Sequence, residues 1–197
     1  MKSLCVYCGS NSGAHPAYVE AAIALGTRMA RDGIRLVYGG GNIGLMGTIA
    51  DAVLEAGGEV TGIIPKQLVD MEVAHRGLTG LEVVGSMHER KLRMFDLADG
   101  FVAMPGGFGT LEEVVEMLTW RQLGISEKPC AFLDVEGYYQ PLIAMMDRMV
   151  EERFLHPAQR EDMWTGRDIE AMLDWMKSYE PAQATKWLSE KHSRELR

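Results

Sequence analysis

The chain has 197 residues, with a hydrophobic fraction of 47% and a charged fraction of 24%, which are typical of one globular domain with a sizeable core. Its net charge of −8 argues against binding to nucleic acid or to an anionic membrane surface, because both need a basic face. The sequence has no apolar run long enough to cross a membrane and no leader-like start, so we expect a cytoplasmic location.

Apolar runs alternate with amphipathic segments along most of the chain. Strands are predicted at residues 4–7, 34–38, 60–64, 101–104 and 130–133, and helices at 16–32, 45–56, 87–98, 110–123, 138–152 and 167–177. The stretch 66–86 is predicted to be irregular. Nearly continuous apolar strands between helices indicate an α/β fold, a doubly wound Rossmann-like parallel sheet with helices on both faces. Residues 1–179 should form the single domain, and 180–197 a charged C-terminal tail with one anchor, Trp187.

Three cysteines, Cys5, Cys8 and Cys130, lie in apolar surroundings. Cys5 and Cys8 form a C-x-x-C pair inside the first predicted strand, but no second pair and no histidine stands at ligand spacing. We therefore expect buried thiols rather than zinc or redox chemistry, and we predict neither a metal site nor a cofactor.

Glycine-rich turns follow three of the predicted strands. In a doubly wound sheet, loops at the carboxyl ends of strands line the crevice where the winding reverses. Glycine lets backbone N–H groups approach a ligand closely, and a helix N-terminus favours an anion. The three turns therefore predict one phosphate-binding crevice, with candidate contacts at Gly9, Ser10, Gly41, Gly106, Gly107 and Gly109.

The second turn, Gly39-x-Gly41-x-x-Gly44, matches the dinucleotide fingerprint. An NAD site also needs an acidic residue at the end of the next strand, but that strand ends in Ile64-Pro65. The turn is therefore interpreted as a phosphate-proximal or close-packing loop. The simplest alternative is that its glycines only let a helix pack on the sheet.

The third turn leads into Thr110-Leu111-Glu112-Glu113. The Thr-x-x-Glu spacing is that of a capping box, in which Thr110 caps the helix and Glu113 bonds back to its N–H. The glycine loop directly before it supports a second interpretation, in which Glu113 is a functional carboxylate beside a bound phosphate.

The predicted helix at 87–98 has two cations on its apolar stripe. On a helical wheel, Arg90 and Lys91 fall among the apolar residues that face the sheet. Burying them without an anion partner is costly. Snorkelling of their stems to the helix end is one alternative. The other, which we favour, is that both enter the crevice and meet a phosphate or a carboxylate.

These same segments resemble the LOG family of cytokinin riboside 5′-monophosphate phosphoribohydrolases, whose bacterial members carry the label possible lysine decarboxylase. Residues 105–113 (PGGFGTLEE) look like the family signature P-G-G-x-G-T-x-x-E. Residues 87–91 (MHERK) are similar to its M-H-x-R-K, and residues 38–47 resemble Y-G-G-G-x-x-G-L-M-G. The resemblance covers about residues 4–154.

The resemblance implies hydrolysis of the N-glycosidic bond of an adenine-type nucleoside 5′-monophosphate, such as AMP or N6-substituted AMP. By motif position it implies catalytic roles for Arg90 and Glu113. It also implies substrate contacts at Gly106, Gly107, Gly109, Thr110, Glu112 and Lys91. The residues that contact an N6 substituent of the base are expected in 72–80, which include Glu72, in 120–124 and in the partner subunit. The family likeness also implies a homodimer with the site at the subunit interface.

Three alternative functions were compared with the same sequence features. A non-catalytic nucleotide-binding or carrier protein would fill the same crevice without turnover. A pyridoxal phosphate-dependent lysine decarboxylase would need a pocket lysine with a suitable context, which the sequence lacks. A purely structural domain leaves Arg90 and Lys91 on the apolar stripe unexplained.

Overall fold

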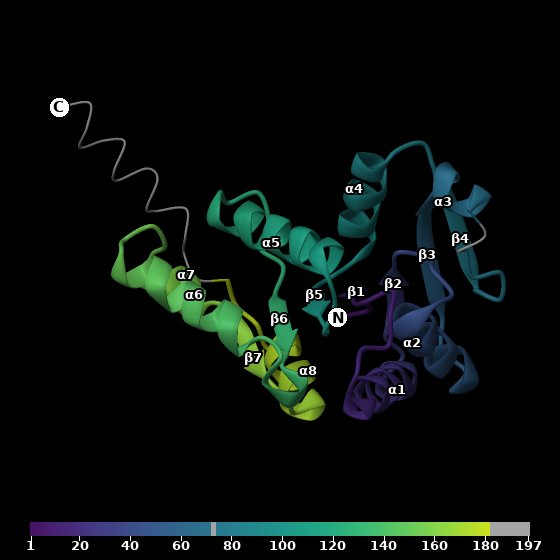
Figure 1. The fold of residues 1–197 in the computed structure, drawn as a ribbon, viewed down its shortest axis with the longest axis horizontal. Helices are drawn as coiled ribbons and strands as arrows, with labels where there is room; N and C mark the ends of the chain where they lie inside the picture. The colour runs from purple at the N-terminus through teal and green to yellow at the C-terminus, as the bar shows by residue number, and fades with distance from the viewer. Residues whose placement is uncertain (72–73, 182–197) are drawn as a thin grey trace.

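The computed structural model describes residues 1–71 and 74–181, which form a seven-stranded parallel sheet with helices on both faces (Figure 1). The strands are β1 (Ser3–Tyr7), β2 (Arg35–Tyr38), β3 (Val60–Pro65), β4 (Gly80–Val84), β5 (Phe101–Ala103), β6 (Cys130–Leu133) and β7 (Trp164–Gly166). The helices are α1 (Pro16–Arg31), α2 (Gly44–Glu55), α3 (Lys66–Asp70), α4 (Met87–Leu97), α5 (Phe108–Gln122), the short η1 (Val135–Gly137), α6 (Gln140–Glu151), α7 (Pro157–Glu161) and α8 (Ile169–Lys177). The predicted doubly wound α/β fold is confirmed.

The order of the strands determines where a ligand can bind. The sheet runs β4-β3-β2-β1-β5-β6-β7, so the chain winds outward from β1 in one direction and then from β5 in the other. Ligands bind to such sheets at this reversal, beyond the carboxyl ends of the strands. The loops after β1 and β5 meet there, and the Gly9 amide donates to the Pro105 carbonyl oxygen over 3.0 Å.

Two apolar cores, one on each face, hold the sheet. Leu4 and Val6 of β1 face a core that includes residues of α1, α2 and α8, whereas Cys5 and Tyr7 face a core that includes residues of α4, α5 and α6. Figure 1 shows the same separation, with α1 and α2 on the side of the sheet away from α4 and α5. Because both faces are covered, the central strands consist mostly of apolar residues, which is why their sequences show no alternation.

The prediction that the cysteines are buried thiols is confirmed. Cys5, Cys8 and Cys130 are free and buried, and burial raises the pKa of the Cys130 thiol to about 11. Within the part of the chain that the structure describes, no group of three or more histidine, cysteine or acidic side chains is arranged to hold a metal ion. No helix among the described residues is long and apolar enough to cross a bilayer.

The prediction of an irregular segment at 66–86 is wrong, because this segment contains α3 and β4, and the short strand β7 was not predicted either. Both strands lie at the edges of the sheet, and each pairs with a single neighbour. In β4, Leu81 and Val83 are exposed, and Glu82 between them pairs with Arg93 of α4. Short edge strands with a glycine at one end therefore lack the continuous apolar run that identified the central strands.

Of the predicted tail, only residues 180 and 181 are described, and Trp187 lies outside the described residues.

A buried ionic cluster ties the end of α5 to the segment before β7. Arg121 donates to the carboxylate of Asp162, to the Asp162 carbonyl oxygen at 2.5 Å and to the Tyr179 hydroxyl at 2.6 Å. The side chains of Arg121 and Asp162 are only 8% and 17% exposed. A charge this deeply buried depends on its partner, since removing one member leaves the other desolvated and unpaired.

Asp162→Ala should therefore lower the free energy of unfolding by about 3 kcal/mol or more. Arg148→Ala is the control, because Arg148 pairs with Glu151 and Glu152 on the surface of α6 and is 62% exposed. Its loss should cost less than about 1 kcal/mol. Urea denaturation followed by circular dichroism measures both, and equal losses in the two variants would contradict this account of the cluster.

Candidate functional site

The loop after β5 leads into α5 without a capping side chain. The helix begins at Phe108, its N-cap is Gly107 in an extended conformation, and no side chain bonds to the first turn. The capping-box prediction is wrong, because Thr110 already lies inside the helix. Its hydroxyl packs against Gly106, where any side chain would overlap it. Glu113 is therefore not used as a cap and is available for other contacts.

The N-terminus of α5 is open on its outer side. Side chains added at Gly107 or Gly109 would meet nothing within 4 Å. The first backbone N–H groups of a helix have no partners within it and carry its positive end, so this opening suits an anion. The loops also converge as predicted, since a side chain at Gly9 would come within 3.3 Å of the Gly106 Cα. Ser10 is exposed on the same β1 loop, and its contact with substrate stays a prediction.

Arg90 extends from α4 into the space between the sheet and α5, and only 8% of it is exposed. Its Nε donates to the carbonyl oxygen of Ile63 at 3.1 Å, and its Nη1 lies 3.4 Å from Glu113 Oε1. A side chain at Gly39 would overlap the guanidinium. The first glycine of the fingerprint-like turn thus makes room for Arg90, which supports the close-packing interpretation of that turn.

Glu113 is buried beside Arg90, and its Oε1 accepts no hydrogen bond from the described residues. Burial raises the pKa of this carboxyl above its ordinary value of 4.5, and the Arg90 guanidinium opposes the shift. Glu112 and Glu116 add to the raised pKa by repulsion, whereas Lys91 lowers it. A carboxylate with these neighbours remains a stronger proton acceptor than an exposed one.

Lys91, the second cation of the α4 stripe, lies against two further glutamates of α5. Its Nζ forms a short contact with Glu112 and lies 3.1 Å from Glu116 Oε1. Burial lowers the pKa of Lys91, but these hydrogen bonds outweigh burial and raise it overall. Both cations of the stripe therefore meet carboxylates, as we favoured, and the snorkelling alternative is wrong.

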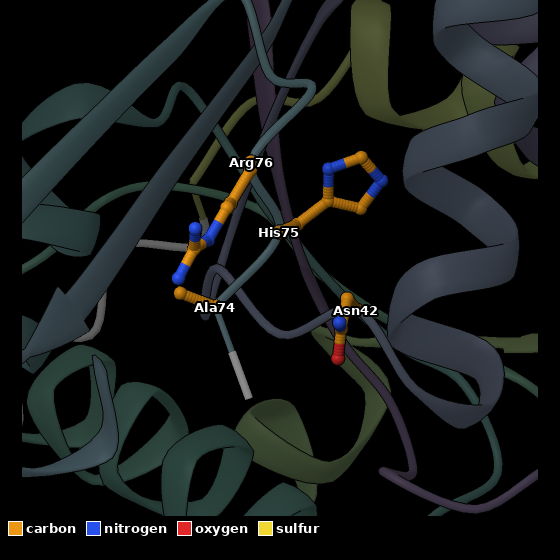
Figure 2. A pocket seen from close by; sticks show the side chains of 4 residues that line it. All are labelled: Asn42, Ala74, His75 and Arg76. Carbon is orange, nitrogen blue, oxygen red and sulfur yellow. The ribbon is translucent and has the colours of Figure 1, made fainter. Parts of the chain in front are cut away.

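A pocket of about 590 Å³ opens beside the turn after β2 and is lined by Asn42, Ala74, His75 and Arg76 (Figure 2). The backbone of this turn holds one wall, since the amide of His75 donates to the Gly40 carbonyl oxygen at 2.8 Å. His75 Nε2 lies 2.9 Å from Oδ1 of Asp51 in α2. Figure 2 shows the Arg76 side chain pointing away from the His75 ring. The volume is in the range of small-molecule sites.

Two further residues, Gly41 and Glu72, were predicted to contact the substrate. Gly41 is buried and bridges to Ala74, and its carbonyl oxygen accepts from the Tyr38 hydroxyl at 3.0 Å, while its contact with substrate stays a prediction. Glu72 lies outside the described residues, and its contact with the base stays a prediction.

Sequence reasoning missed Gly39 and Glu116. Glu116 stands one helical turn after Glu112, a spacing that could have identified it as a second partner for Lys91.

The shifted carboxyl can be tested directly. The side-chain carboxyl carbon of Glu113, followed by NMR over a pH series, should titrate with a midpoint above 4.5 because burial disfavours its ionised form. In Arg90→Met the midpoint should rise further, since a positive charge is lost. Glu82 is the internal control, because its hydrogen bond from Arg93 lowers its pKa below 4.5. A Glu113 midpoint at or below that of Glu82 would be incompatible with this geometry.

Comparison with known proteins agrees with these features. The family model described as "Possible lysine decarboxylase" matches residues 46–176. The chain is 44% identical over 180 residues to cytokinin riboside 5′-monophosphate phosphoribohydrolase LOG7 of Arabidopsis thaliana, covering 91% of this chain and 83% of that protein. It is 43% identical over 189 residues to the probable phosphoribohydrolase LOGL1 of Oryza sativa subsp. japonica, covering 93% and 85%.

Solved structures share the fold at lower identity. The molybdenum cofactor binding protein from Rippkaea orientalis is 24% identical, with a TM-score of 0.69 over 90% of this chain and 97% of that one. The molybdenum cofactor carrier protein from Chlamydomonas reinhardtii is 18% identical, with a TM-score of 0.64 over 89% and 95%. Because the family model covers more than half of the chain and the curated relatives match nearly all of it, the chain belongs to the LOG family, described as possible lysine decarboxylases.

Proposed function

We propose that the protein is a nucleoside 5′-monophosphate phosphoribohydrolase, which hydrolyses AMP or N6-substituted AMP to the free base and ribose 5-phosphate. The observation that carries the proposal is the buried pair of Arg90 and Glu113 beside the open N-terminus of α5. The relatives in Arabidopsis thaliana and Oryza sativa are named for this activity on cytokinin riboside 5′-monophosphates, which supports the proposal.

The 5′-phosphate of the substrate binds at the N-terminus of α5. The first N–H groups of a helix have no partner within it, and together with the positive end of α5 they favour the charge of the phosphate. Gly107 and Gly109 leave the approach open, and Thr110 lies in the same first turn. Glu113 is one turn further along the helix. A phosphate held at the helix start therefore fixes the distance between the sugar and this carboxylate, which is an orientation effect.

The reaction breaks the bond between C1′ and the base nitrogen, whose electron pair leaves with the base while positive charge builds on the ribose ring. The ionised Glu113 stabilises that charge and accepts a proton from the water whose oxygen bonds to C1′. The base takes up a proton from solvent as it leaves, and Glu113 afterwards returns its proton to solvent. Arg90 keeps Glu113 ionised and oriented, and the more exposed Glu112 binds the ribose hydroxyls.

The base lies toward the pocket formed by Asn42, Ala74, His75 and Arg76 in this proposal. Two contacts support that direction, because the turn that bonds to His75 also packs against Arg90. The amide of Asn42 and the guanidinium of Arg76 can both hydrogen-bond a purine.

We also propose a cytoplasmic location, where the free thiols Cys5, Cys8 and Cys130 would stay reduced.

A nucleotide-binding or carrier protein is the second candidate, since the solved structures named above share the fold. That function needs only the helix N-terminus and the pocket. It gives no reason for a buried glutamate of raised pKa paired with an arginine, so we favour the hydrolase.

Glu113→Gln should lower turnover of AMP at least about 100-fold while its affinity for AMP changes little, because the phosphate contacts remain and the carboxylate is lost. Chromatography of released base, with AMP and N6-isopentenyl-AMP as substrates, measures turnover, and calorimetry measures binding. Glu20→Gln, on an exposed position of α1, should behave as the wild type. Turnover by Glu113→Gln near the wild-type rate would remove Glu113 from the mechanism.

We further propose a homodimer with the site at the subunit interface. Exposed apolar side chains on α4 and α5, including Leu92 at 52% and Val115 at 43%, support such an interface close to the site.

Light scattering should give twice the mass of one chain, and Leu92→Glu should dissociate the dimer by burying an unpaired charge. Ile23→Glu is the matched control, since Ile23 is 47% exposed on α1, across the sheet. A monomeric wild type, or equal behaviour of the two variants, would refute this interface.

A further inference from the structure

Lys91 lies between two carboxylates that stand one turn apart on α5. Its Nζ contacts Glu112 and is 3.1 Å from Glu116 Oε1. The two glutamates differ in their surroundings, since the Glu112 side chain is 55% exposed and that of Glu116 is 26% exposed. The second oxygen of Glu116 is buried and accepts no hydrogen bond from the described residues. Glu112 is therefore the partner with room to turn into solvent, and Glu116 is the more enclosed of the two.

The burial of the Lys91 side chain means that its ammonium group needs a carboxylate partner at all times. Its side chain is only 12% exposed, and an ammonium group buried to that extent without a counter-ion is costly. Its flexible four-carbon stem would then carry the charge out to water. Once Glu112 binds the ribose, Glu116 is the remaining carboxylate in contact with Lys91 among the described residues.

The position of Lys91 matters because its charge acts on Glu113. Lys91 favours the ionised form of Glu113, whereas Glu112 and Glu116 oppose it. Arg90, Lys91 and these three glutamates form one charged cluster between α4 and α5. Loss of Lys91 from the cluster would leave a single cation against the remaining carboxylates.

We propose that Glu116 is a positioning residue, which holds Lys91 beside Glu113 while Glu112 leaves its ion pair to bind the ribose hydroxyls of the nucleotide. The proposal rests on the phosphoribohydrolase function given above. Glu116 touches neither the substrate nor the reacting atoms in this scheme, and its favourable effect on turnover comes through its hold on Lys91.

A double-mutant cycle with AMP tests the proposal. Glu116→Gln should lower kcat about tenfold with little change in KM, because the lost interaction matters while Glu112 is engaged with substrate. Lys91→Met should lower kcat at least as much. The double variant should be no slower than Lys91→Met alone, since without Lys91 Glu116 has no cation to hold and its own charge only opposes ionisation of Glu113. Glu151→Gln, which removes a glutamate paired with Arg148 on the surface of α6, should leave kcat unchanged.

Circular dichroism and urea midpoints check that each variant is folded. Reductions in kcat that multiply in the double variant would overturn the proposal, as would an unchanged kcat in Glu116→Gln or an effect on KM alone. These results differ from failure of the proposed function itself. In that case the wild type would release no base from any nucleotide, and the positioning role would fall with it.

Discussion

The burial of Arg90 against Glu113 is the interaction on which the arrangement of the site depends. Arg90 joins three elements, because its guanidinium bonds to the end of β3, packs against the glycine turn after β2 and faces Glu113 of α5. Removing either charge would leave the other buried and unpaired. A buried pair of this kind is weak evidence for stability, so its position in a crevice is better explained by chemistry.

The sheet brings this pair to an anion-binding helix end. Because the winding reverses between β1 and β5, the loops that follow these strands meet, and α5 begins directly behind them. A phosphate bound at the start of α5 would have three glutamates within the next turns, which by themselves would repel it. Arg90 and Lys91 offset most of that charge, so an acidic chain of net charge −8 can still hold an anion here.

Much of this could be predicted from sequence, and the failures have physical causes. The wheel of α4 identified Arg90 and Lys91 because two cations on an apolar stripe need partners, and the glycine turns after the central strands indicated where the crevice lies. The capping box was wrong because spacing alone cannot tell whether the N-cap is Thr110 or, as here, the extended Gly107 three residues earlier. The edge strands β4 and β7 lack an apolar signature, and Gly39 gains its meaning only from a distant arginine.

In the function that we propose, the site breaks the bond between ribose and base, and the phosphate serves only for binding. The most direct measurement is the identity of the products from AMP, with free base, ribose 5-phosphate and inorganic phosphate quantified in one reaction. We expect equal amounts of adenine and ribose 5-phosphate, with no inorganic phosphate above the enzyme-free blank. Release of adenosine and phosphate, or recovery of bound AMP unchanged, would contradict it.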